Sequence, residues 1–368
     1  MGSNGWLRGL LAAVLVCVCL GDSEAVAQSE EIVEPSGSGE DQTGSDVVGS
    51  QVGATAIGGF IAGVGGQISK FGGNLAPLIQ LGHLPDEFVG QRGRAAGFEP
   101  QRLAIWTNFS STNIEEDVVA TRYKGDLRTY MIGADYQYDD MLLAGVAFGL
   151  DRGEINTQFN GGTVDTNTNI ISTYASYRFD DMFSVDGIIG YGRGDIEQVR
   201  FAGATAVNSD TTYDRFFGQV TGNAVTTVPE VENAILAGQL GLLYAIERID
   251  DFVEDNGTNV TGKTNPLTQV QIGLRGGYSF FDIADNWVIH PYAQARYYAD
   301  LQSNTIDVGA GQTAHPNDDK EVQLALGVDF FAGADLSGNF EYSRSFGRRD
   351  FTSDVFSLNL RLKFGPGE

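Results

Sequence analysis

Few residues of this 368-residue chain are of types that could do covalent chemistry. A hydrolase needs a nucleophile held beside a base, and the chain has only three histidines, His83, His290 and His315. His290 alternates with polar residues in a strand-like stretch, but no motif places a serine or an aspartate beside it. His315 lies in an acidic stretch whose spacing matches no metal motif. We predict no catalytic residue, no metal and no cofactor.

The two cysteines, Cys17 and Cys19, lie in the apolar run from Leu10 to Leu20. This run follows Arg8, is too short to cross a bilayer as a helix, and is followed by Ala25-Val26-Ala27. The pattern predicts a signal peptide over residues 1–27, after whose removal no thiol remains for a disulfide or a metal. An N-terminal anchor helix and a lipoprotein signal are the alternatives, and the polar residues after the run and Val16 before Cys17 disfavour them.

A second set of reactive side chains carries charges of both signs at positions that a strand would turn to one face. Burying such groups singly would cost several kcal/mol, so we expect them to pair or to stay hydrated. Two roles are open: they line the wall of a wet interior, or they form a network with a segment threaded through it. The predicted lumen-lining residues are Asp151, Asp186, Arg215, Glu247, Arg275, His290, Arg296, Asp329 and Arg361, with Lys363 beside them.

The last stretch of the chain, Val355 to Phe364, shows the element that would position such residues. Its apolar side chains fall on every second position, and polar or charged ones stand between them, as in a strand with one apolar and one polar face. A soluble strand on a core or a membrane barrel strand fits this pattern. The apolar set is Phe356, Leu358, Leu360, Leu362 and Phe364.

The same alternation recurs in twelve segments, at about 101–109, 126–138, 141–150, 167–179, 182–192, 213–225, 233–248, 267–280, 287–299, 321–331, 335–345 and 355–364. Two-residue turns, such as 139–140 and 180–181, alternate with longer polar connections at 110–125, 152–166, 194–212 and 249–266. Short turns at one end and long loops at the other are typical of a membrane barrel. The sequence predicts an all-β, single-chain, 12-stranded antiparallel transmembrane β-barrel over residues 101–364. Trp287, Phe364, Tyr136 and Tyr138 should form an aromatic girdle at the short-turn end.

The region ahead of the barrel divides by composition. Residues 28–50 are polar and acidic, which predicts a disordered leader, and residues 51–100 form a linker. Within the linker, Ile57, Ile61, Val64 and Ile68 recur at helical spacing and predict a helix over 52–71, rich in glycine. Small residues suit a segment that threads the pore; a flexible or surface-lying linker is the alternative. Residues 365–368 form a short tail.

The formal net charge of −25 argues against a nucleic-acid partner, whose phosphates would be repelled. It is equally compatible with a self-repelling surface that serves no partner.

Three motifs carry a family resemblance. They are G-A-D-Y-Q-Y-D-D-M-L-L-A-G-V-A-F-G-L at 133–150, the hairpin S-T-Y-A-S-Y-R-F-D-D-M-F-S-V-D-G-I-I-G-Y-G at 172–192, and His290-Pro291-Tyr292-Ala293. Together with the alternation that ends at Phe364, they resemble the autotransporter translocator domain. The resemblance implies a bacterial outer-membrane barrel with a linker helix in its pore, which helps its own N-terminal passenger reach the cell surface. It also implies partners: the lipid bilayer, periplasmic chaperones and the outer-membrane assembly machinery, for which the five apolar residues ending at Phe364 would be the signal.

The chain departs from the family pattern at its end, where four residues follow Phe364. No Asn-Asn pair is present for the family's self-cleavage, and residues 28–100 contain no β-helix repeat. We therefore expect a type V secretion translocator with a vestigial passenger and no enzymatic activity. A stand-alone porin-like channel is the alternative, and an outer-membrane hydrolase ranks last.

Overall fold

The computed structural model describes residues 44–71, 103–118, 121–139, 141–231, 233–281, 287–302, 306–307, 313–314, 319–332, 335–348 and 350–364. The predicted signal peptide, the greater part of the leader, the second half of the linker and the tail lie outside these residues.

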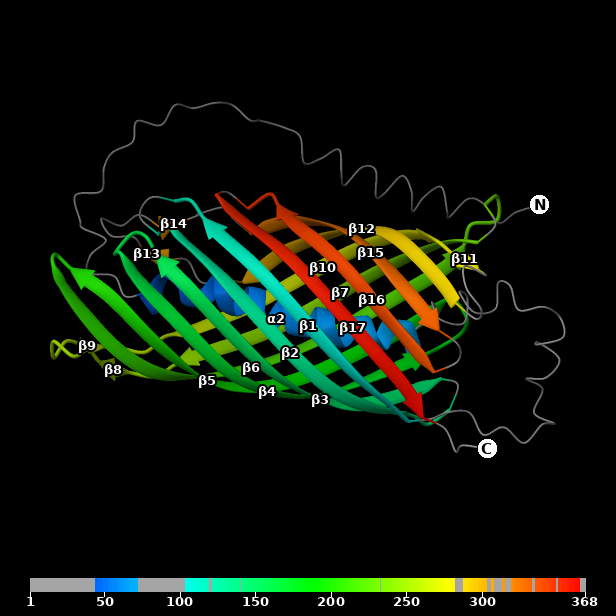
Figure 1. Ribbon diagram of the computed structural model, residues 1–368, viewed down its shortest axis with the longest axis horizontal. Coiled ribbons are helices and arrows are strands. Elements are labelled where there is room, and N and C mark those ends of the chain that lie inside the picture. The colour runs from blue at the N-terminus through cyan, green and yellow to red at the C-terminus, as the bar shows by residue number, and fades with distance from the viewer. Residues whose placement is uncertain are drawn as a thin grey trace, which may run out of the picture. The chain divides into compact units, whose positions relative to one another are not determined.

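Within the described residues, twelve long strands form one antiparallel sheet that closes on itself (Figure 1). Each strand pairs with its neighbours in the sequence, as in a meander. The strands are β1 (Leu103–Glu116), β2 (Tyr123–Gln137), β3 (Leu142–Thr157), β4 (Gly162–Arg178), β5 (Phe183–Ala202), β6 (Thr205–Thr227), β7 (Ala234–Ile249), β10 (Thr264–Tyr278), β12 (Trp287–Gln302), β15 (Lys320–Ala332), β16 (Leu336–Phe346) and β17 (Phe351–Phe364).

The ring closes where the first and last long strands meet. β1 and β17 pair from Leu103 opposite Phe364 to Glu116 opposite Phe351, and β10 pairs with both β7 and β12. Closure removes the open sheet edges that a bilayer could not satisfy. The predicted 12-stranded barrel is confirmed.

The two faces of the wall differ as the alternation predicts. Val146 on β3 and Leu326 on β15 point outward, with 59% and 65% of their surface exposed. Their neighbours in the sequence point inward and are buried, among them Ala147 and Ala325. The outward face carries the large apolar residues, whereas the inward face mixes polar, charged and apolar ones.

One end of the barrel, called here the short-turn end, has the tight turns. Asp139 Oδ1 accepts hydrogen bonds of 2.8 Å from the backbone N–H groups of Met141 and Leu142, and Asp180 makes the equivalent bonds after β4. An aspartate that caps the next backbone groups in this way stabilises a tight turn, which explains the acidic turn residues.

Exposed aromatic side chains surround the short-turn end in close pairs. Ring centroids lie 5.0 Å apart for Tyr136 and Tyr138 and 5.1 Å apart for Tyr177 and Phe179. Trp287 stacks on Phe330 at 6.1 Å. The residues expected at this girdle are therefore exposed on the outer surface of that end.

The opposite end, the long-hairpin end, corrects the loop prediction. Strands continue through most of residues 110–125, 152–166 and 194–212, which were expected to be loops. β5 and β6, for example, extend to a two-residue turn at Gly203, whose positive φ of 63° suits glycine. Two short strands, β8 (Phe252–Val253) and β9 (Asn259–Val260), form a further hairpin within 249–266. The polar, Asn- and Thr-rich sequences hid these strands because their outer face is polar, although their inner face carries buried apolar residues such as Ile155, Val164 and Ile196.

Three further short strands complete the described strands. β11 (Phe280–Phe281) adds to β12, and β13 (Ile306–Asp307) pairs with β14 (Thr313–Ala314).

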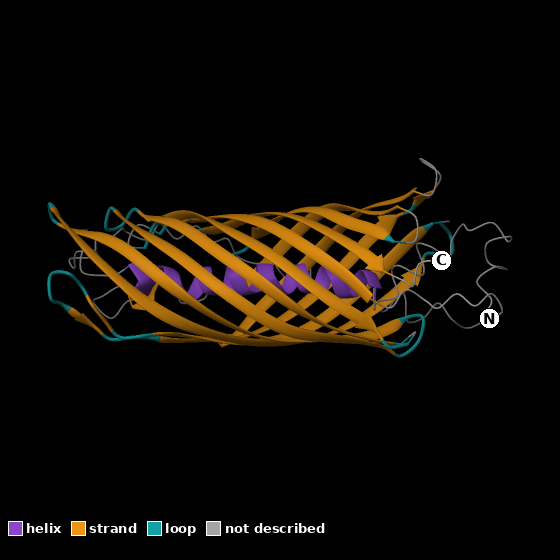
Figure 2. Cartoon of the chain, turned by 60° about the horizontal axis from the view of Figure 1, so that its bottom comes forward, coloured by secondary structure: helices purple, strands orange, loops and turns teal. Residues whose placement is uncertain are grey.

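The helix α2 (Gly44–Phe71) runs inside the barrel (Figure 2). It begins at Gly44 rather than at Val52, so the expected boundary of the disordered leader is too late by the seven residues 44–50. Its N-terminal part lies toward the long-hairpin end, where Val52 packs with Ile114 and Tyr123. No helix among the described residues combines the length and the hydropathy that a bilayer crossing requires.

Candidate functional site: a lumen occupied by a helix

An apolar stripe of α2 packs against one side of the lumen. Ile57, Phe60, Ile61, Val64 and Ile68 are buried, and Phe60 meets Phe217 of β6 edge-on with ring centroids 5.5 Å apart. The wall side of this contact is formed by residues including Trp106, Met131, Ile170, Phe217 and Leu243. Since a fully buried apolar side chain contributes roughly 1.5–3 kcal/mol, these five side chains stabilise the helix in the lumen.

Glycines let the helix approach the wall. A Cβ on Gly53 would lie 2.8 Å from Glu247 Oε2, and one on Gly63 would collide with the Met131 side chain and lie 3.0 Å from Asn108 Oδ1. On the other face of the helix, a Cβ on Gly58 or Gly65 would meet nothing within 4 Å. The glycines on one face of the helix thus allow close packing against the wall, whereas those on the other face border open space.

A chain of amides joins the helix to the wall. Gln67 Nε2 donates to Asn359 Oδ1 at 3.0 Å, and Asn108 Nδ2 donates to the same oxygen at 2.7 Å. Asn359 Nδ2 reaches Asn339 Oδ1 at 3.4 Å. All four residues are buried, so these bonds satisfy groups that would otherwise be costly to bury.

The predicted charges at the long-hairpin half of the lumen come together as a triad. Arg215 of β6 lies with Nη2 2.6 Å from Glu247 Oε2 of β7, and with Nη1 3.7 Å from Asp151 Oδ2 of β3. Thr129 Oγ1 donates to Asp151 at 2.8 Å. The three charged groups are nearly fully buried and form an ion network beside Gly53 of the helix.

A second network lies on the wall of β10, β12, β15 and β16. Arg275 pairs with Asp329, and its guanidinium stands 3.4 Å from the centroid of the Tyr292 ring. Arg296 Nη1 lies 3.2 Å from Glu341 Oε1, and the Tyr292 hydroxyl donates to Glu341 at 2.7 Å. Arg275, Arg296 and Asp329 were predicted to line the lumen, whereas Glu341 was not.

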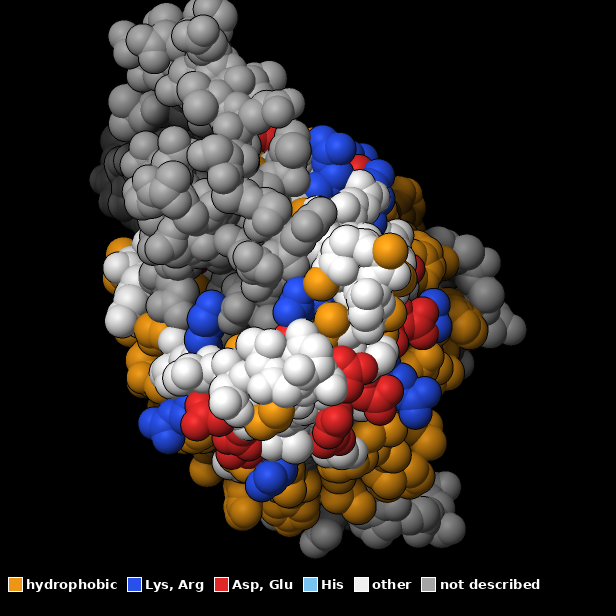
Figure 3. All heavy atoms as spheres, turned by 90° about the vertical axis from the view of Figure 1, so that its left-hand side faces the viewer, with side chains coloured by type: hydrophobic (Ala, Val, Ile, Leu, Met, Phe, Trp, Pro, Cys, Tyr) orange, Lys and Arg blue, Asp and Glu red, His pale blue; other side chains and the backbone are white. Residues whose placement is uncertain are grey.

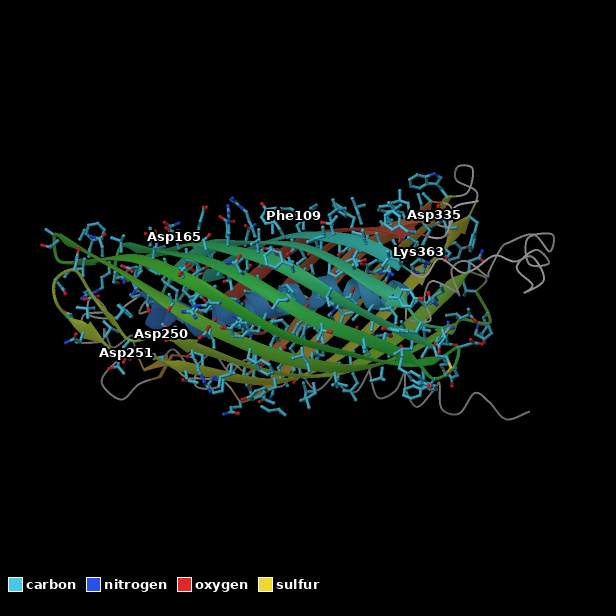
Figure 4. All side chains as sticks on the ribbon, turned by 90° about the horizontal axis from the view of Figure 1, so that it is seen from below. Phe109, Asp165, Asp250, Asp251, Asp335 and Lys363 are labelled. Atoms are coloured by element: carbon cyan, nitrogen blue, oxygen red, sulfur yellow. The ribbon has the colours of Figure 1, made fainter. Side chains whose placement is uncertain are left out.

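Arg361 forms a third network, across the strands where the ring closes. Its guanidinium makes two bonds of 2.5 Å to Asp135 of β2. Tyr174 of β4 donates to Asp135 Oδ2 at 3.1 Å, and Trp106 Nε1 of β1 donates to the Tyr174 hydroxyl at 2.6 Å. Side chains of β17, β1, β2 and β4 are thereby linked inside the wall. Lys363, two residues on, is only partly buried and lies at the short-turn end with Asp335 (Figure 4).

Asp186 and His290, the remaining predicted residues, find polar neighbours that sequence could not supply. Asn223 Nδ2 donates to Asp186 at 2.7 Å. Ser279 Oγ lies 2.9 Å from His290 Nδ1, and His290 stands opposite Asp329 in the β12–β15 register. No sequence motif placed a serine or an aspartate beside His290, and the fold brings Ser279 and Asp329 there. Ser279 and His290 are almost fully buried, and neither lines the lumen cavity described below.

A cavity of about 460 Å³ remains between the helix and the polar wall. The helix contributes small residues to it, including Thr55, Gly58, Ala62 and Gly65, together with Ile57, Ile61 and Ile68 of its apolar stripe. The wall contributes Arg275, Arg296, Glu341 and a row of glutamines that includes Gln269 and Gln271. The lumen therefore holds both the packed apolar contact of α2 and an unfilled cavity beside the helix, and Ile57, Ile61 and Ile68 border both.

The five residues of the predicted assembly signal point outward from β17. Phe356, Leu358, Leu360, Leu362 and Phe364 have 36–42% of their surface exposed. They form one apolar stripe on the outer face of the closing strand.

A charged cluster stands at the long-hairpin end. Arg348, in the turn after β16, lies 2.9 Å from Asp300 and 2.8 Å from Glu321. Burial alone would lower the pKa of the Arg348 guanidinium, but the two carboxylates outweigh it and raise that pKa. Arg200 and Glu254 form a bidentate pair at the same end, which holds the β8–β9 hairpin against β5.

Asp135, Asn108, Asn359, Glu341 and Arg348 were missed by the sequence analysis. The first four fall on the polar positions of their alternating strands, so the signal was present. Only the register across the ring, which sequence does not reveal, says which of these polar positions meet.

Comparison with known proteins gives a family and a fold. The model of the Autotransporter beta-domain family matches residues 105–343. No curated protein matches the chain.

Three solved structures share the architecture. The translocator domain of autotransporter NalP from Neisseria meningitidis is 18% identical, with a TM-score of 0.58, and the alignment covers 77% of this chain and 97% of that one. The beta domain of the Bordetella autotransporter BrkA is 19% identical, with a TM-score of 0.59 and 72% and 100% coverage. The transport unit of AIDA-I from Escherichia coli is 13% identical, with a TM-score of 0.55 and 79% and 98% coverage. At these identities the likeness speaks for the fold alone.

Proposed function

This chain belongs to the autotransporter beta-domain family and is an outer-membrane β-barrel of type V secretion, and we propose that α2 plugs its lumen once the segment ahead of Gly44 has been carried outward. The observation that carries the proposal is the buried stripe of α2 against the inner wall. A helix that only lay along a surface would not bury Phe60 and Val64 completely, with both at 0% exposure.

The direction of the helix supports the proposal. In outer-membrane barrels the short turns face the periplasm and the long connections face outward. Val52 lies among residues of the long hairpins, whereas Gln67 lies further toward the short-turn end, beside Asn359. The residues that precede α2 in the chain would therefore start from the outer side, as a passenger should.

An open porin-like channel is the competing function, and the cavity of about 460 Å³ is the feature in its favour. The two functions differ in what blocks current. We expect low single-channel conductance in planar bilayers for the whole chain, and a several-fold increase for a variant that lacks residues 51–72. Equally small conductance in the two proteins would contradict the proposal that α2 plugs the lumen.

Exposure of the segment ahead of α2 is a separate test. A cysteine placed at Ser36 should react with a membrane-impermeant maleimide on intact cells, whereas one placed at Asp181, in a short turn, should react only after the outer membrane is opened. Labelling of the two positions with the reverse pattern would contradict the proposed orientation.

We further propose that the apolar stripe ending at Phe364 is recognised by the assembly machinery, with periplasmic chaperones holding the chain before insertion. The outward position of all five side chains supports this, because they stay available while the inner face of β17 forms its networks. We assign no enzymatic role to Ser279 and His290, since neither faces the cavity.

A further inference from the structure

A patch of arginines stands on the outer face of the barrel, on β2, β3 and β5. Arg128 of β2 lies directly opposite Arg152 of β3, and Arg193 of β5 lies opposite Asn169 of β4. Asn167 of β4 completes the group as the cross-strand neighbour of Arg152. All five side chains are exposed, and we call them the arginine patch.

The patch adjoins the apolar outer band. Two residues from Arg128, Arg152 and Arg193 toward the short-turn end stand Tyr130, Leu150 and Tyr191, which point to the same side because strand side chains alternate. Ile171, two residues from Asn169 toward the short-turn end, is 62% exposed. Phe109 of β1 continues this edge, with its ring 5.2 Å from that of Tyr130 (Figure 4). The arginine patch thus marks the place where the lipid-facing surface ends.

The charges of Arg128 and Arg152 are uncompensated among the described residues. Neither guanidinium has an ion pair or a hydrogen bond there, in a protein whose formal net charge is −25. Like charges directly opposite each other in a sheet are destabilising. An anion between them would turn this repulsion into attraction, since guanidinium groups bind phosphate oxygens in pairs.

A row of carboxylates borders the arginine patch on its long-hairpin side and limits where an anion can bind. Asp126, Glu154, Asp165 and Glu197 are successive cross-strand neighbours on β2 to β5, two residues beyond Arg128 and Arg152 toward the long-hairpin end. Asp165 marks this row near that end in Figure 4, and Figure 3 shows acidic and basic side chains around the rim above the hydrophobic flank. These four carboxylates repel a phosphate on the long-hairpin side of the arginines. The arginine patch is therefore the position at which a phosphate would bind.

We propose that the arginine patch binds the phosphate groups of a phosphorylated glycolipid of the outer leaflet. The guanidinium groups contact the phosphate, the carboxamides of Asn167 and Asn169 donate to sugar hydroxyls, and the acyl chains lie on the band below. The inference rests on the outer-membrane location and does not depend on the plug or on translocation.

The test is lipid binding by the whole chain in detergent, followed by native mass spectrometry with EDTA present, so that the carboxylate row cannot bind a phosphate through a divalent cation. The probes are diphosphorylated lipid A and its dephosphorylated form. We expect the unchanged protein to bind the phosphorylated form at least about tenfold more tightly, and Arg128→Gln/Arg152→Gln to lose that preference.

Two further variants make the result specific. Arg122→Gln/Lys124→Gln removes the same charge at the start of β2, but at residues already paired with Asp117 and Glu115, and should keep the preference. Arg128→Lys/Arg152→Lys keeps the charge without the paired geometry and should show an intermediate preference. Heat-modifiability on a gel checks that each barrel is folded.

Equal binding of both lipid forms by the unchanged protein would overturn the proposal. So would an equal loss in the Arg122→Gln/Lys124→Gln control, because the effect would then be one of net charge. Tight retention of inorganic phosphate without lipid would overturn the assignment to a headgroup.

Discussion

At the scale of single residues, the glycines of α2 divide by the face on which they lie. Gly63 faces Met131 and Asn108, whereas Gly58 faces open space. Leucine at either position raises helix propensity by the same amount, up to about 1 kcal/mol. The two positions are therefore a matched pair that separates fit in the lumen from helix formation.

We expect Gly63→Leu to displace the helix from the wall and raise single-channel conductance, because the added side chain meets filled space. Gly58→Leu should lower conductance, because it projects into the remaining cavity. Both variants are measured beside the unchanged protein in planar bilayers. Opposite signs are the signature; a rise in both would mean that α2 is not seated as described.

The pair of Arg361 and Asp135 is the second residue-scale case. Removal of one partner from a buried pair leaves the other charge uncompensated and typically costs about 3–5 kcal/mol, whereas replacing both can be nearly neutral. We expect Arg361→Leu to lower the unfolding free energy in urea titrations by about that amount.

The double variant Arg361→Leu/Asp135→Leu should recover most of this loss, measured in the same titrations. If the double variant were as unstable as the sum of the two single ones, the coupling energy between Arg361 and Asp135 would be zero, which would contradict a stabilising ion pair.

At the scale of elements, β17 closes the ring and carries an outward apolar stripe with no inward role. Phe364 is the residue of that stripe nearest the short-turn end. We expect Phe364→Ala to lower the heat-modifiable fraction in outer membranes severalfold, while the refolded protein keeps its midpoint in urea within a small margin. Phe356→Ala, on the same strand and face, shows whether the signal depends on its terminal aromatic residue or is shared along the stripe. Normal membrane levels of Phe364→Ala would exclude a role in assembly.

The strands also show where alternation stops being informative. It located all twelve, because the outer face must be apolar wherever lipid covers it. Beyond the lipid edge, at stretches such as 152–157 and 194–202, the outer face is polar and the inner face keeps only isolated apolar residues such as Ile155 and Ile196, so the apolar signal is weak. Backbone pairing continues there with little hydrophobic contrast along the sequence, and the ladder to the next strand reveals it.

At the scale of the whole molecule, the barrel wall and the helix have separate means of stabilisation. The wall is closed by backbone ladders on every strand, and α2 adds side-chain packing inside. We expect a variant without residues 44–71 to insert and to remain heat-modifiable, but to shift mobility at a temperature lower by several degrees, since its lumen loses the buried contacts of α2. Failure of that variant to form a barrel would mean that the helix is part of the folding core.

The amino-acid sequence by itself determined the barrel, its number of strands, the outward-facing apolar stripe and the helical periodicity within the linker. These follow from local rules: side chains alternate in a strand, and lipid tolerates only apolar groups on one face. The sequence also placed the charged side chains on the inner face.

The tertiary structure alone decided which inner groups meet, because partners such as Arg361 and Asp135 are separated by 226 positions and are brought together by the closure of the ring. It also chose between the two placements left open for the helix. That choice depends on a match between the glycine face of α2 and the wall of the lumen, and a match between two surfaces exists only once both have folded.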